Sequence, residues 1–457
     1  MNPLSTIAAI STPYGSGGIS VIRVSGDKAI DICDRVYKNK NKTLASVPSH
    51  TINYGFIKDE RENTIDEVLV SVMKKPNSYT GEDVVEINCH GGIISTNKIL
   101  EQLLLNGAEL ATPGEFTKRA FLNGRIDLVK AESVIDIINS KTELEHNVSV
   151  NQLEGRLSKK IDGLRQKLLA LLAHVQVLVD YPEEDLEPLT DDEYTDVLKD
   201  CLDDIEKLIE TSKQGKIIRE GVKTAIVGKP NVGKSSLLNL LYGDERAIVT
   251  DIAGTTRDTI EEYITVGDVM LKVIDTAGIH ETDDVIENIG VDKSRKAIES
   301  SDLIIFMVDA SAGFSEEDEE IARLVADRNP IVLINKSDTG KGIDKDALCE
   351  KFDTVIEFSV KEETGLNALK SVIKERFDMG KVDLASGSVI TNVRHRDALV
   401  KARECVKAAL DSVNMGFELN LTFIDIEDAI GRLGEIVGLT VGEEVVDRIF
   451  HNFCLGK

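Results

Sequence analysis

The sequence predicts a multidomain protein: a strand-rich α+β region, a helical domain, and an α/β domain inserted into the helical domain. Changes of hydrophobic period carry this prediction. Short apolar runs alternate with helical patterns between residues 216 and 379, and helical periodicity flanks them on both sides. A chain of 457 residues is long enough for two or three domains. We expect the first region to span 1–118, the helical segments 119–215 and 380–457, and the inserted domain 216–379.

The composition limits the classes of function. There are 80 acidic and 54 basic residues, a formal net charge of −26. This balance argues against a protein that coats nucleic acid, because phosphate binding needs clustered lysine and arginine, but it leaves room for a small local basic site. The six cysteines lie far apart without metal-binding spacing, so we expect free thiols. No apolar run reaches the roughly 18 residues of a membrane span and no secretory signal is visible, so we expect a cytoplasmic protein.

The first region should be built mainly from strands and turns. Ile19–Val24, Val68–Met73 and Val84–Asn88 are rich in β-branched residues, with Gly and Pro turns between them. One helix is expected from Ile93 to Asn106, where apolar residues have helical spacing and Gly107 ends the pattern.

The next segment should be helical. From Leu153 to Val175 apolar residues recur at intervals of three and four, which predicts one long amphipathic helix. The segment from Asp180 to Glu206 contains 13 acidic residues and a single lysine, a composition that is typical of a solvated loop and of the solvated side of a helix. Helical periodicity returns after Asp383, first through Val389 to Leu410 and then from Ile424 to Phe450.

The inserted domain should contain a doubly wound, mostly parallel sheet. The runs Val222–Val227, Met270–Ile274, Leu303–Val308 and Ile331–Ile334 are short and almost continuously apolar. Strands of this kind are buried on both faces, as parallel strands covered by helices are.

A phosphate-binding loop follows the first of these strands. Gly228–Ser235 reads GKPNVGKS, a complete GxxxxGKS between a strand and a predicted helix. Glycines let backbone N–H groups surround phosphate oxygens, and the helix N-terminus adds its positive dipole. Lys234 is expected on the β- and γ-phosphates, and Ser235 offers its hydroxyl to Mg²⁺.

Two further motifs point to guanine. Asp275–Gly278 is a DxxG after a strand, and Asn335–Asp338 is an NKxD after another. The Asp338 carboxylate can accept hydrogen bonds from N1–H and the exocyclic amine of guanine, which adenine does not offer. Ser359–Lys361 stands where a further loop would support the base. The three motifs in this order predict GTP rather than ATP.

The residue after DxxG is unusual for a Ras-like GTPase. A glutamine there orients the attacking water in Ras, but this chain has Ile279, which cannot form a hydrogen bond. Another residue must therefore position the water, and the sequence shows no arginine finger.

The motifs resemble those of the MnmE/TrmE family of tRNA modification GTPases. In the inserted domain the resemblance rests on Gly228–Ser236, on Thr250–Asp258 (TDIAGTTRD) and on Asp275–Glu287 (DTAGIHETDDVIE). Outside it, Pro76–Gly92, Thr112–Gly124 and the terminal CLGK, Cys454–Lys457, also fit. The resemblance covers essentially the whole chain. Ribosome-assembly GTPases share the G-domain motifs but lack the flanking blocks.

The resemblance implies a fold and a set of partners. It implies an N-terminal domain that binds tetrahydrofolate and dimerises, a helical domain, and an inserted G domain. It further implies that the chain works with the flavoprotein MnmG, which carries FAD, in an α2β2 complex. Together they would add an aminomethyl or carboxymethylaminomethyl group to the wobble uridine of tRNA, with GTP hydrolysis activated by K⁺.

The resemblance also implies the nucleotide-site residues. Asn231 would bind K⁺ through its side chain, with Thr250, Ile252 and Thr255 helping through their backbone. Ser235 and Thr256 would bind Mg²⁺, and Glu287 would orient the hydrolytic water. Without the family, Glu287 is more simply interpreted as a solvated carboxylate in an acidic loop. The full GTP-binding set is Asn231, Val232, Gly233, Lys234, Ser235, Ser236, Thr250, Asp251, Ile252, Ala253, Gly254, Thr255, Thr256, Asp275, Thr276, Ala277, Gly278, Asn335, Lys336, Ser337, Asp338, Ser359, Val360 and Lys361.

For a folate such as 5-formyl-tetrahydrofolate, the family pattern implies Arg23, Glu82, Arg125 and Lys457. Arg125 is often lysine in the family, and Arg23 could instead be a buried ion-pair partner. Cys454 is either a nucleophile near the folate or a buried structural thiol.

Two functions stay open at this point. The favoured one is a GTPase that forms half of a tRNA-modifying complex. The alternative is a regulatory GTPase switch that acts in ribosome assembly.

Overall fold

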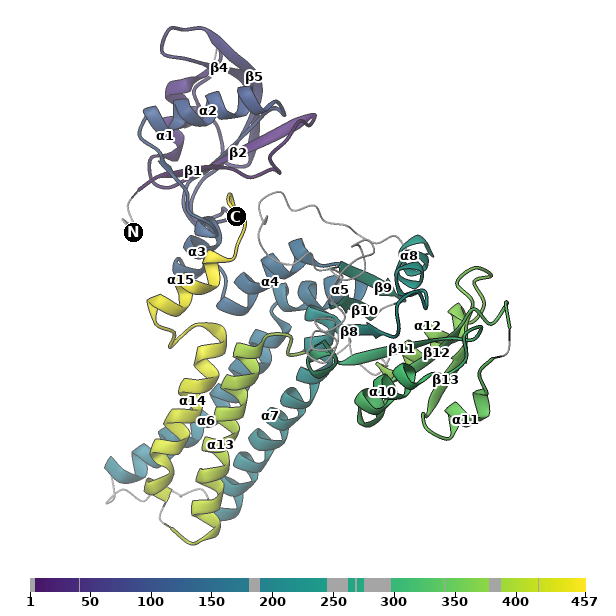
Figure 1. Cartoon of the computed structure of the whole chain (residues 1–457). Helices are drawn as coiled ribbons and strands as arrows, with labels where there is room; N and C mark the ends of the chain where they lie inside the picture. Colours follow the sequence, from purple (N-terminus) through teal and green to yellow (C-terminus); the bar gives the residue numbers. More distant parts are fainter. Residues whose placement is uncertain are drawn as a thin grey trace. The chain divides into compact units, whose positions relative to one another are not determined.

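The computed structural model describes residues 5–40, 42–180, 190–244, 262–267, 269–274, 297–340, 342–377, 388–417 and 419–457 (Figure 1). These residues divide into two compact units. The first unit comes from residues 1–138, 151–202 and 401–457, and the second from 139–150 and 203–400. The domain boundaries expected from the sequence stay a prediction.

The first unit contains a seven-stranded sheet in the order β3-β4-β5-β6-β2-β1-β7. Neighbouring strands are antiparallel except β1 and β7, which are parallel. The strands are β1 (Ile7–Ile10), β2 (Ile19–Ser25), β3 (Tyr37–Lys38), β4 (Thr51–Lys58), β5 (Thr64–Met73), β6 (Val84–His90) and β7 (Glu109–Leu110).

One face of this sheet forms a core with two helices, α1 (Ala29–Val36) and α2 (Ile93–Leu105), as Figure 1 shows. The alternation along β5 illustrates why. Val68, Val70 and Val72 are buried beneath the helices, whereas Leu69 between them is 47% exposed. A strand with one covered face has this period of two. The predicted strands and the predicted helix of this region are therefore confirmed.

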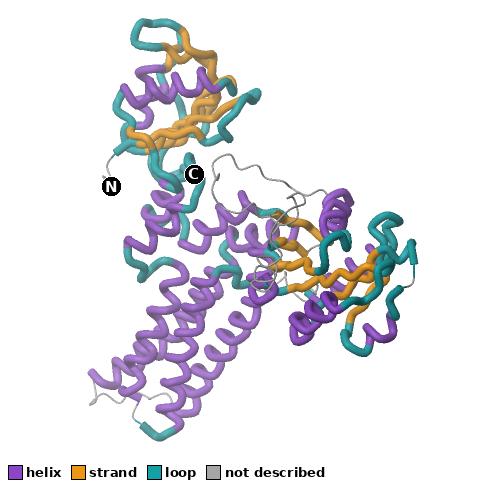
Figure 2. The backbone as a smooth tube through the Cα atoms, viewed as in Figure 1, coloured by secondary structure: helices purple, strands orange, loops and turns teal. Residues whose placement is uncertain are grey.

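The remainder of the first unit is helical (Figure 2). It contains α3 (Glu115–Leu122), α4 (Leu128–Asn139), α6 (Arg156–Asp180), α14 (Phe423–Val437) and α15 (Glu443–His451), together with parts of α7 (Asp191–Glu220) and α13 (Val393–Asn414). Two short 3-10 turns, η1 (Leu44–Ser46) and η5 (Leu419–Thr422), complete it. Buried leucines and isoleucines of α6 lie at the predicted spacing, for example Leu157, Ile161, Leu164 and Leu168.

The prediction of one helix from Leu153 onward was wrong. Leu153 ends α5 (Glu143–Leu153), and Gly155 then adopts a left-handed conformation with φ +82° before α6 begins. Glycine tolerates this conformation because it has no Cβ, so the chain turns there. The acidic residues 191–206 lie on α7, where Asp192, Asp196 and Asp200 are exposed, as expected for a solvated face.

The second unit contains a six-stranded sheet in the order β13-β12-β11-β8-β10-β9. All neighbours are parallel except β9 and β10. The strands are β8 (Val222–Val227), β9 (Glu262–Val266), β10 (Val269–Val273), β11 (Leu303–Asp309), β12 (Ile331–Asn335) and β13 (Thr354–Glu357). The four predicted strands are present, and β9 and β13 are additional. Every residue of β11 is buried, which agrees with a central strand covered on both faces.

Helices that pack on this sheet are α8 (Lys234–Asp244), α10 (Glu316–Val325), α11 (Lys345–Cys349) and α12 (Leu366–Arg376), with the 3-10 turn η3 (Ala326–Arg328). Residues that flank the sheet in sequence also join its core. They are Leu144 and Val148 of α5, Ile218 of α7, and Val389. Val389 was expected within a helix, but α13 begins only at Val393. The backbone N–H of Ile390 instead donates to the Thr211 hydroxyl of α7 over 3.1 Å.

Candidate functional site

The phosphate-binding loop connects β8 to α8 in the second unit. Gly228 has φ +151°, and a Cβ there would lie 2.4 Å from the Met307 carbonyl oxygen. Gly233 has φ +102°, and a Cβ there would lie 2.4 Å from Nδ2 of Asn335. Both positions therefore require glycine, for conformation and for space.

Lys234 starts α8 and its ammonium group lies against the loop backbone. Nζ donates to the carbonyl oxygens of Gly228 and Lys229, both over 2.8 Å. Burial lowers the pKa of Lys234. These contacts hold the ammonium at the loop that is predicted to surround the phosphates, next to Ser235 in the first turn of the helix.

Asn335 connects three of the predicted motifs. It ends β12 and is 2% exposed. Its Nδ2 donates to the carbonyl oxygen of Val232 over 2.6 Å, and its Oδ1 accepts from the backbone N–H of Val360 over 3.3 Å. The phosphate loop, the NKSD loop and the loop at 359–361 are therefore held together by one side chain.

Lys336 adds a second link between the same loops. It has φ +62°, and its Nζ donates to the Asn231 carbonyl oxygen over 3.1 Å and to Oδ2 of Asp309 over 2.5 Å. Burial would raise the pKa of Asp309, but hydrogen bonds from Lys336 and Ser311 outweigh it and lower that pKa. Asp309 was not among the predicted site residues. Its sequence signal is a carboxylate at the end of a fully apolar strand.

The carboxylate expected to recognise guanine is oriented by a serine. Ser359 Oγ donates to Oδ1 of Asp338 over 2.7 Å. Ser337 Oγ donates to the Phe358 carbonyl oxygen over 2.9 Å, which joins the two loops a second time. Lys361 lies on the same loop, and its Nζ is 3.9 Å from Oε1 of Glu362.

A further anchor of the phosphate loop was missed by the sequence reasoning. Lys229 Nζ lies 2.7 Å from Oδ2 of Asp318, which is fully buried, and donates to Ser315 Oγ over 2.8 Å. Ser315 and Asp318 form the capping box of α10. The loop is thus fixed to the start of a helix by an ion pair with a desolvated carboxylate.

Several predicted residues lie outside the described residues. They are Thr250–Thr256, Asp275–Gly278 and Glu287. Of the predicted K⁺ and Mg²⁺ ligands, Asn231 and Ser235 are described. Asn231 is exposed and has φ +62°.

In the first unit, three of the four predicted folate residues surround one ring. The guanidinium carbon of Arg23 lies 5.2 Å from the centroid of Tyr79, that of Arg125 lies 5.5 Å from it, and Lys457 Nζ lies 5.8 Å from it. Burial lowers the pKa of Lys457, and the nearby charge of Arg23 adds to this shift. Tyr79 was not predicted as a site residue, although it stands in the Pro76–Gly92 block.

Arg23 also has the ion pair that the sequence left open. Its guanidinium lies 2.9 Å from Oε1 of Glu86, and its NH1 donates to the Gly456 carbonyl oxygen over 3.2 Å. The C-terminal residues are therefore held against β2. This contact requires a close approach at Gly456, where a Cβ would lie 2.4 Å from the Ile10 carbonyl oxygen.

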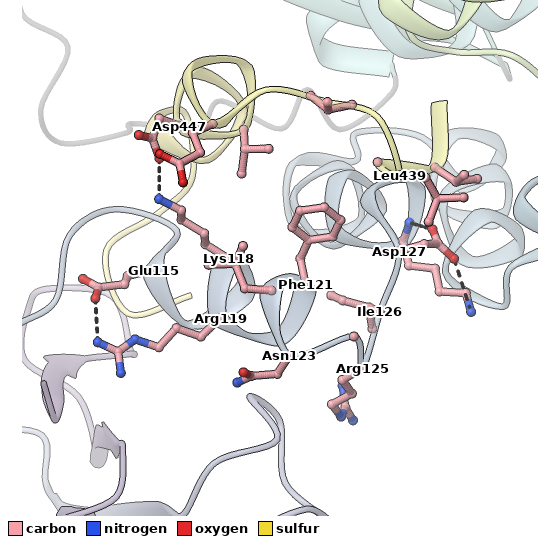
Figure 3. A pocket seen from close by; sticks show the side chains of 18 of the residues that line it. Glu115, Lys118, Arg119, Phe121, Asn123, Arg125, Ile126, Asp127, Leu439 and Asp447 are labelled. Atoms are coloured by element: carbon pink, nitrogen blue, oxygen red, sulfur yellow. Dashed lines mark hydrogen bonds and ion pairs between the residues drawn. The ribbon is translucent and has the colours of Figure 1, made fainter. Parts of the chain in front are cut away.

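Glu82 faces a different set of partners. Ser25 Oγ donates to its Oε2 over 2.7 Å, and Arg119 NH1 lies 3.3 Å from both carboxylate oxygens. Arg119 in turn donates to Glu115 over 2.9 Å. Glu82 and Arg125 meet at a cavity of about 860 Å³ lined by α3, the start of α4 and the α14–α15 connection (Figure 3). Figure 3 shows ion pairs around it, Lys118 with Asp447 and Arg119 with Glu115.

Of the two interpretations of Cys454, the buried structural thiol was wrong, because Cys454 is exposed. Its carbonyl oxygen, rather than its sulfur, accepts hydrogen bonds from the backbone of Gly114 and Lys457. Among the described residues, no helix is both long enough and apolar enough to span a membrane.

Comparison with known proteins places the chain in a family. The model of the MnmE helical domain matches residues 128–454, and that of the GTP-binding protein TrmE N-terminus matches residues 6–125. The tRNA modification GTPase MnmE of Clostridioides difficile is 49% identical over 455 residues, which is 99% of each chain. The chain belongs to the MnmE family of tRNA modification GTPases. The enzyme of the same name from Bacillus cereus is also 49% identical, over 456 residues and 99% of each chain.

Membership of the MnmE family confirms the resemblance, the multidomain α+β and α/β fold class, and the enzyme class expected from the sequence, a GTP hydrolase. Among solved structures, a variant of Aquifex aeolicus Era bound to GDP and AlF4⁻ is 30% identical over 40% of this chain and 65% of that chain, with a TM-score of 0.27.

Proposed function

We propose that this GTPase acts with the flavoprotein MnmG to add an aminomethyl or carboxymethylaminomethyl group at C5 of the tRNA wobble uridine. The observation that carries the proposal is the guanine-recognition loop, joined through Asn335 to a complete phosphate loop. It stands in a chain that is 49% identical to tRNA modification GTPases along its whole length. The location of the protein in the cytoplasm remains a prediction from the sequence.

The nucleotide would be held from two ends. Asp338, oriented by Ser359, would accept hydrogen bonds from N1–H and the amine of guanine. Lys234 would leave its two backbone carbonyl partners for the β- and γ-phosphates, which offer full negative charges instead. Mg²⁺ would be held by Ser235 and Thr256 and would neutralise charge on the phosphate oxygens.

K⁺ would supply the charge that an arginine finger supplies in other GTPases. Asn231 supports this role, because its backbone is fixed by Lys336 while the residue is exposed at the rim of the loop. Thr250, Ile252 and Thr255 would complete the set of ligands through their backbone oxygens. Glu287 would orient the water, which Ile279 cannot do. Asp275–Gly278 and the other residues of the GTP-binding set named above would contact the nucleotide as well.

The folate would lie near Arg23, Glu82, Arg125 and Lys457. Three cations around Tyr79 suit the carboxylates of a folate glutamate tail, and Glu82 suits the amino-pyrimidine edge of the pterin. Arg119 already neutralises Glu82, so the pterin would share this carboxylate with it. We also propose that the protein forms a homodimer through its N-terminal domain.

Co-purification tests the proposal against the alternative of a ribosome-assembly switch. The full-length chain, with an affinity tag and loaded with GTP, should retain a flavoprotein in an equimolar α2β2 complex, seen by FAD absorbance and by mass. Retention of ribosomal subunits without a flavoprotein would favour the alternative.

A further inference from the structure

A basic cavity of about 460 Å³ lies in the second unit, away from the nucleotide loops. Its lining includes Gly221, which directly precedes β8, and Asp302, which directly precedes β11. The phosphate loop follows the other end of β8, and the NKSD loop follows the same end of β12, which is parallel to β11. The cavity therefore lies at the amino-terminal edge of the sheet, and the nucleotide site lies at the carboxyl edge.

The charge of this cavity differs from that of the two larger ones. Lys213, Lys216 and Arg328 line it together with one carboxylate, Asp302. The 860 Å³ cavity has five carboxylates against four cations, and a cavity of about 570 Å³ in the first unit has two of each. Of these three cavities, only the basic cavity has an excess of positive charge, in a chain whose net charge is −26.

Among the described residues, no carboxylate forms a salt bridge with Lys213, Lys216 or Arg328 of the basic cavity. Arg328 uses NH2 to donate to the Ser301 carbonyl oxygen over 2.7 Å, which leaves other guanidinium N–H groups for a ligand. Asp302 is itself held by the backbone, since Lys223 N–H donates to its Oδ2 over 3.2 Å.

A role in helix stability does not account for all three cations. Lys213 and Lys216 are one turn apart on α7 and share a face, but the basic residue in the last turn of this helix, where the helix dipole acts, is Arg219. Arg328 comes from η3, at the end of a different helix, and lines the same cavity. The apolar side of the cavity comes from Ile217 and the partly exposed ring of Phe377.

We propose that the basic cavity binds the phosphodiester backbone of the RNA substrate. A phosphate would lie among Lys213, Lys216 and Arg328, and an unstacked base would lie against Phe377. Phosphate contacts from lysine and arginine, beside an aromatic ring that stacks a base, are how proteins bind single-stranded RNA. This proposal rests on the proposed function, in which tRNA is the substrate.

Equilibrium binding of unmodified tRNA to the full-length chain, measured over a range of KCl concentrations, tests the proposal. The variant Lys213→Ala/Lys216→Ala should raise Kd about tenfold near 0.1 M salt and lower the slope of log K against log salt by about 1.5, since two phosphate contacts are lost. The matched control is Lys199→Ala/Lys207→Ala, which removes two lysines from the same helix outside the cavity and should leave both quantities unchanged. Asp302→Asn should tighten binding, because it removes the one carboxylate.

Two further readouts make the result decisive. GTPase rates of the lysine variants should be normal, because the cavity lies at the opposite edge of the sheet. Acylation of lysines, followed by peptide mass spectrometry, should show tRNA protecting Lys213 and Lys216 but not Lys199 or Lys207. Unchanged Kd and slope in the double variant would overturn the proposal. The proposal would also be overturned if inorganic tripolyphosphate, but not tRNA, protected Lys213 and Lys216 from acylation. It would be overturned as well if the double variant lost binding of the flavoprotein but kept binding of tRNA. If the wild-type chain neither binds nor modifies tRNA, the proposed function itself fails.

Discussion

The side-chain amide of Asn335 donates a hydrogen bond to the carbonyl oxygen of Val232 over 2.6 Å, across more than one hundred residues of sequence. The same side chain accepts a hydrogen bond from Val360, so the loops that recognise phosphate and base are fixed to each other. A GTPase needs this coupling, because the guanine ring and the γ-phosphate lie at opposite ends of a rigid arrangement of loops.

Asn335→Ala should therefore weaken GTP binding by about ten- to a hundredfold, since it leaves the buried carbonyl of Val232 and the half-buried N–H of Val360 without their partner. Asn335→Asp should weaken binding at least as much, because a carboxylate oxygen would then face the Val232 carbonyl oxygen. Fluorescent GTP titration measures the effect. Asn414→Ala, at an exposed helix end, is the control. Normal affinity in both Asn335 variants would show that the link is dispensable.

Asp338→Asn should shift base selectivity from GTP to xanthosine triphosphate. The exocyclic amine of guanine becomes a carbonyl in xanthine, and an asparagine amide can donate to it. Ser359→Ala should weaken GTP binding by a smaller factor without changing selectivity, because Ser359 only orients the carboxylate. Competition binding between GTP and xanthosine triphosphate measures the ratio of their affinities for each variant. A variant at position 338 that kept full preference for GTP would refute the assignment of NKSD as the guanine-recognition motif.

GTP turnover should be faster in K⁺ than in Na⁺ at equal ionic strength. Asn231→Ala should abolish that difference while leaving nucleotide affinity largely intact, because the loop backbone and Lys234 remain. Steady-state hydrolysis in the two salts measures it. Equal rates in K⁺ and Na⁺ for the wild-type chain would contradict the potassium proposal.

Glu287→Ala should lower kcat by roughly two orders of magnitude, the typical cost of losing a group that positions or deprotonates water. KM for GTP should change little, because the interaction that is removed stabilises the transition state and not the bound ground state. Asp283→Ala and Asp284→Ala, from the same acidic run, are matched controls. Near-normal turnover, or a defect mainly in nucleotide affinity, would remove Glu287 from the mechanism.

The local part of the nucleotide site could be predicted because short-range rules govern it. The glycines at 228 and 233 are required by backbone conformation and space, and the strand before them is marked by its apolar run. The links between loops could not be predicted. Asp318 pairs with Lys229 from 89 positions away, and Asp309 pairs with Lys336 only because β11 and β12 are neighbours in the sheet.

The errors in the fold have local causes as well. The helix expected from Leu153 is interrupted at Gly155, whose left-handed conformation has no periodic signature. Strands β9 and β13 were not predicted because they lie at the edges of the sheet, where the apolar pattern is weaker. In the first unit, Tyr79 became visible as the centre of three cations only when residues 23, 125 and 457 were brought together by the fold.

Mass spectrometry of tRNA nucleosides from a deletion strain tests most directly whether this GTPase modifies the wobble uridine. The deletion strain should lack the aminomethyl and carboxymethylaminomethyl groups at C5. The wild-type gene should restore them, whereas Lys234→Ala, which removes the phosphate-binding ammonium, should not. Unchanged wobble uridines in the deletion strain, together with a defect in ribosomal subunits, would contradict the proposed function and favour the ribosome-assembly switch.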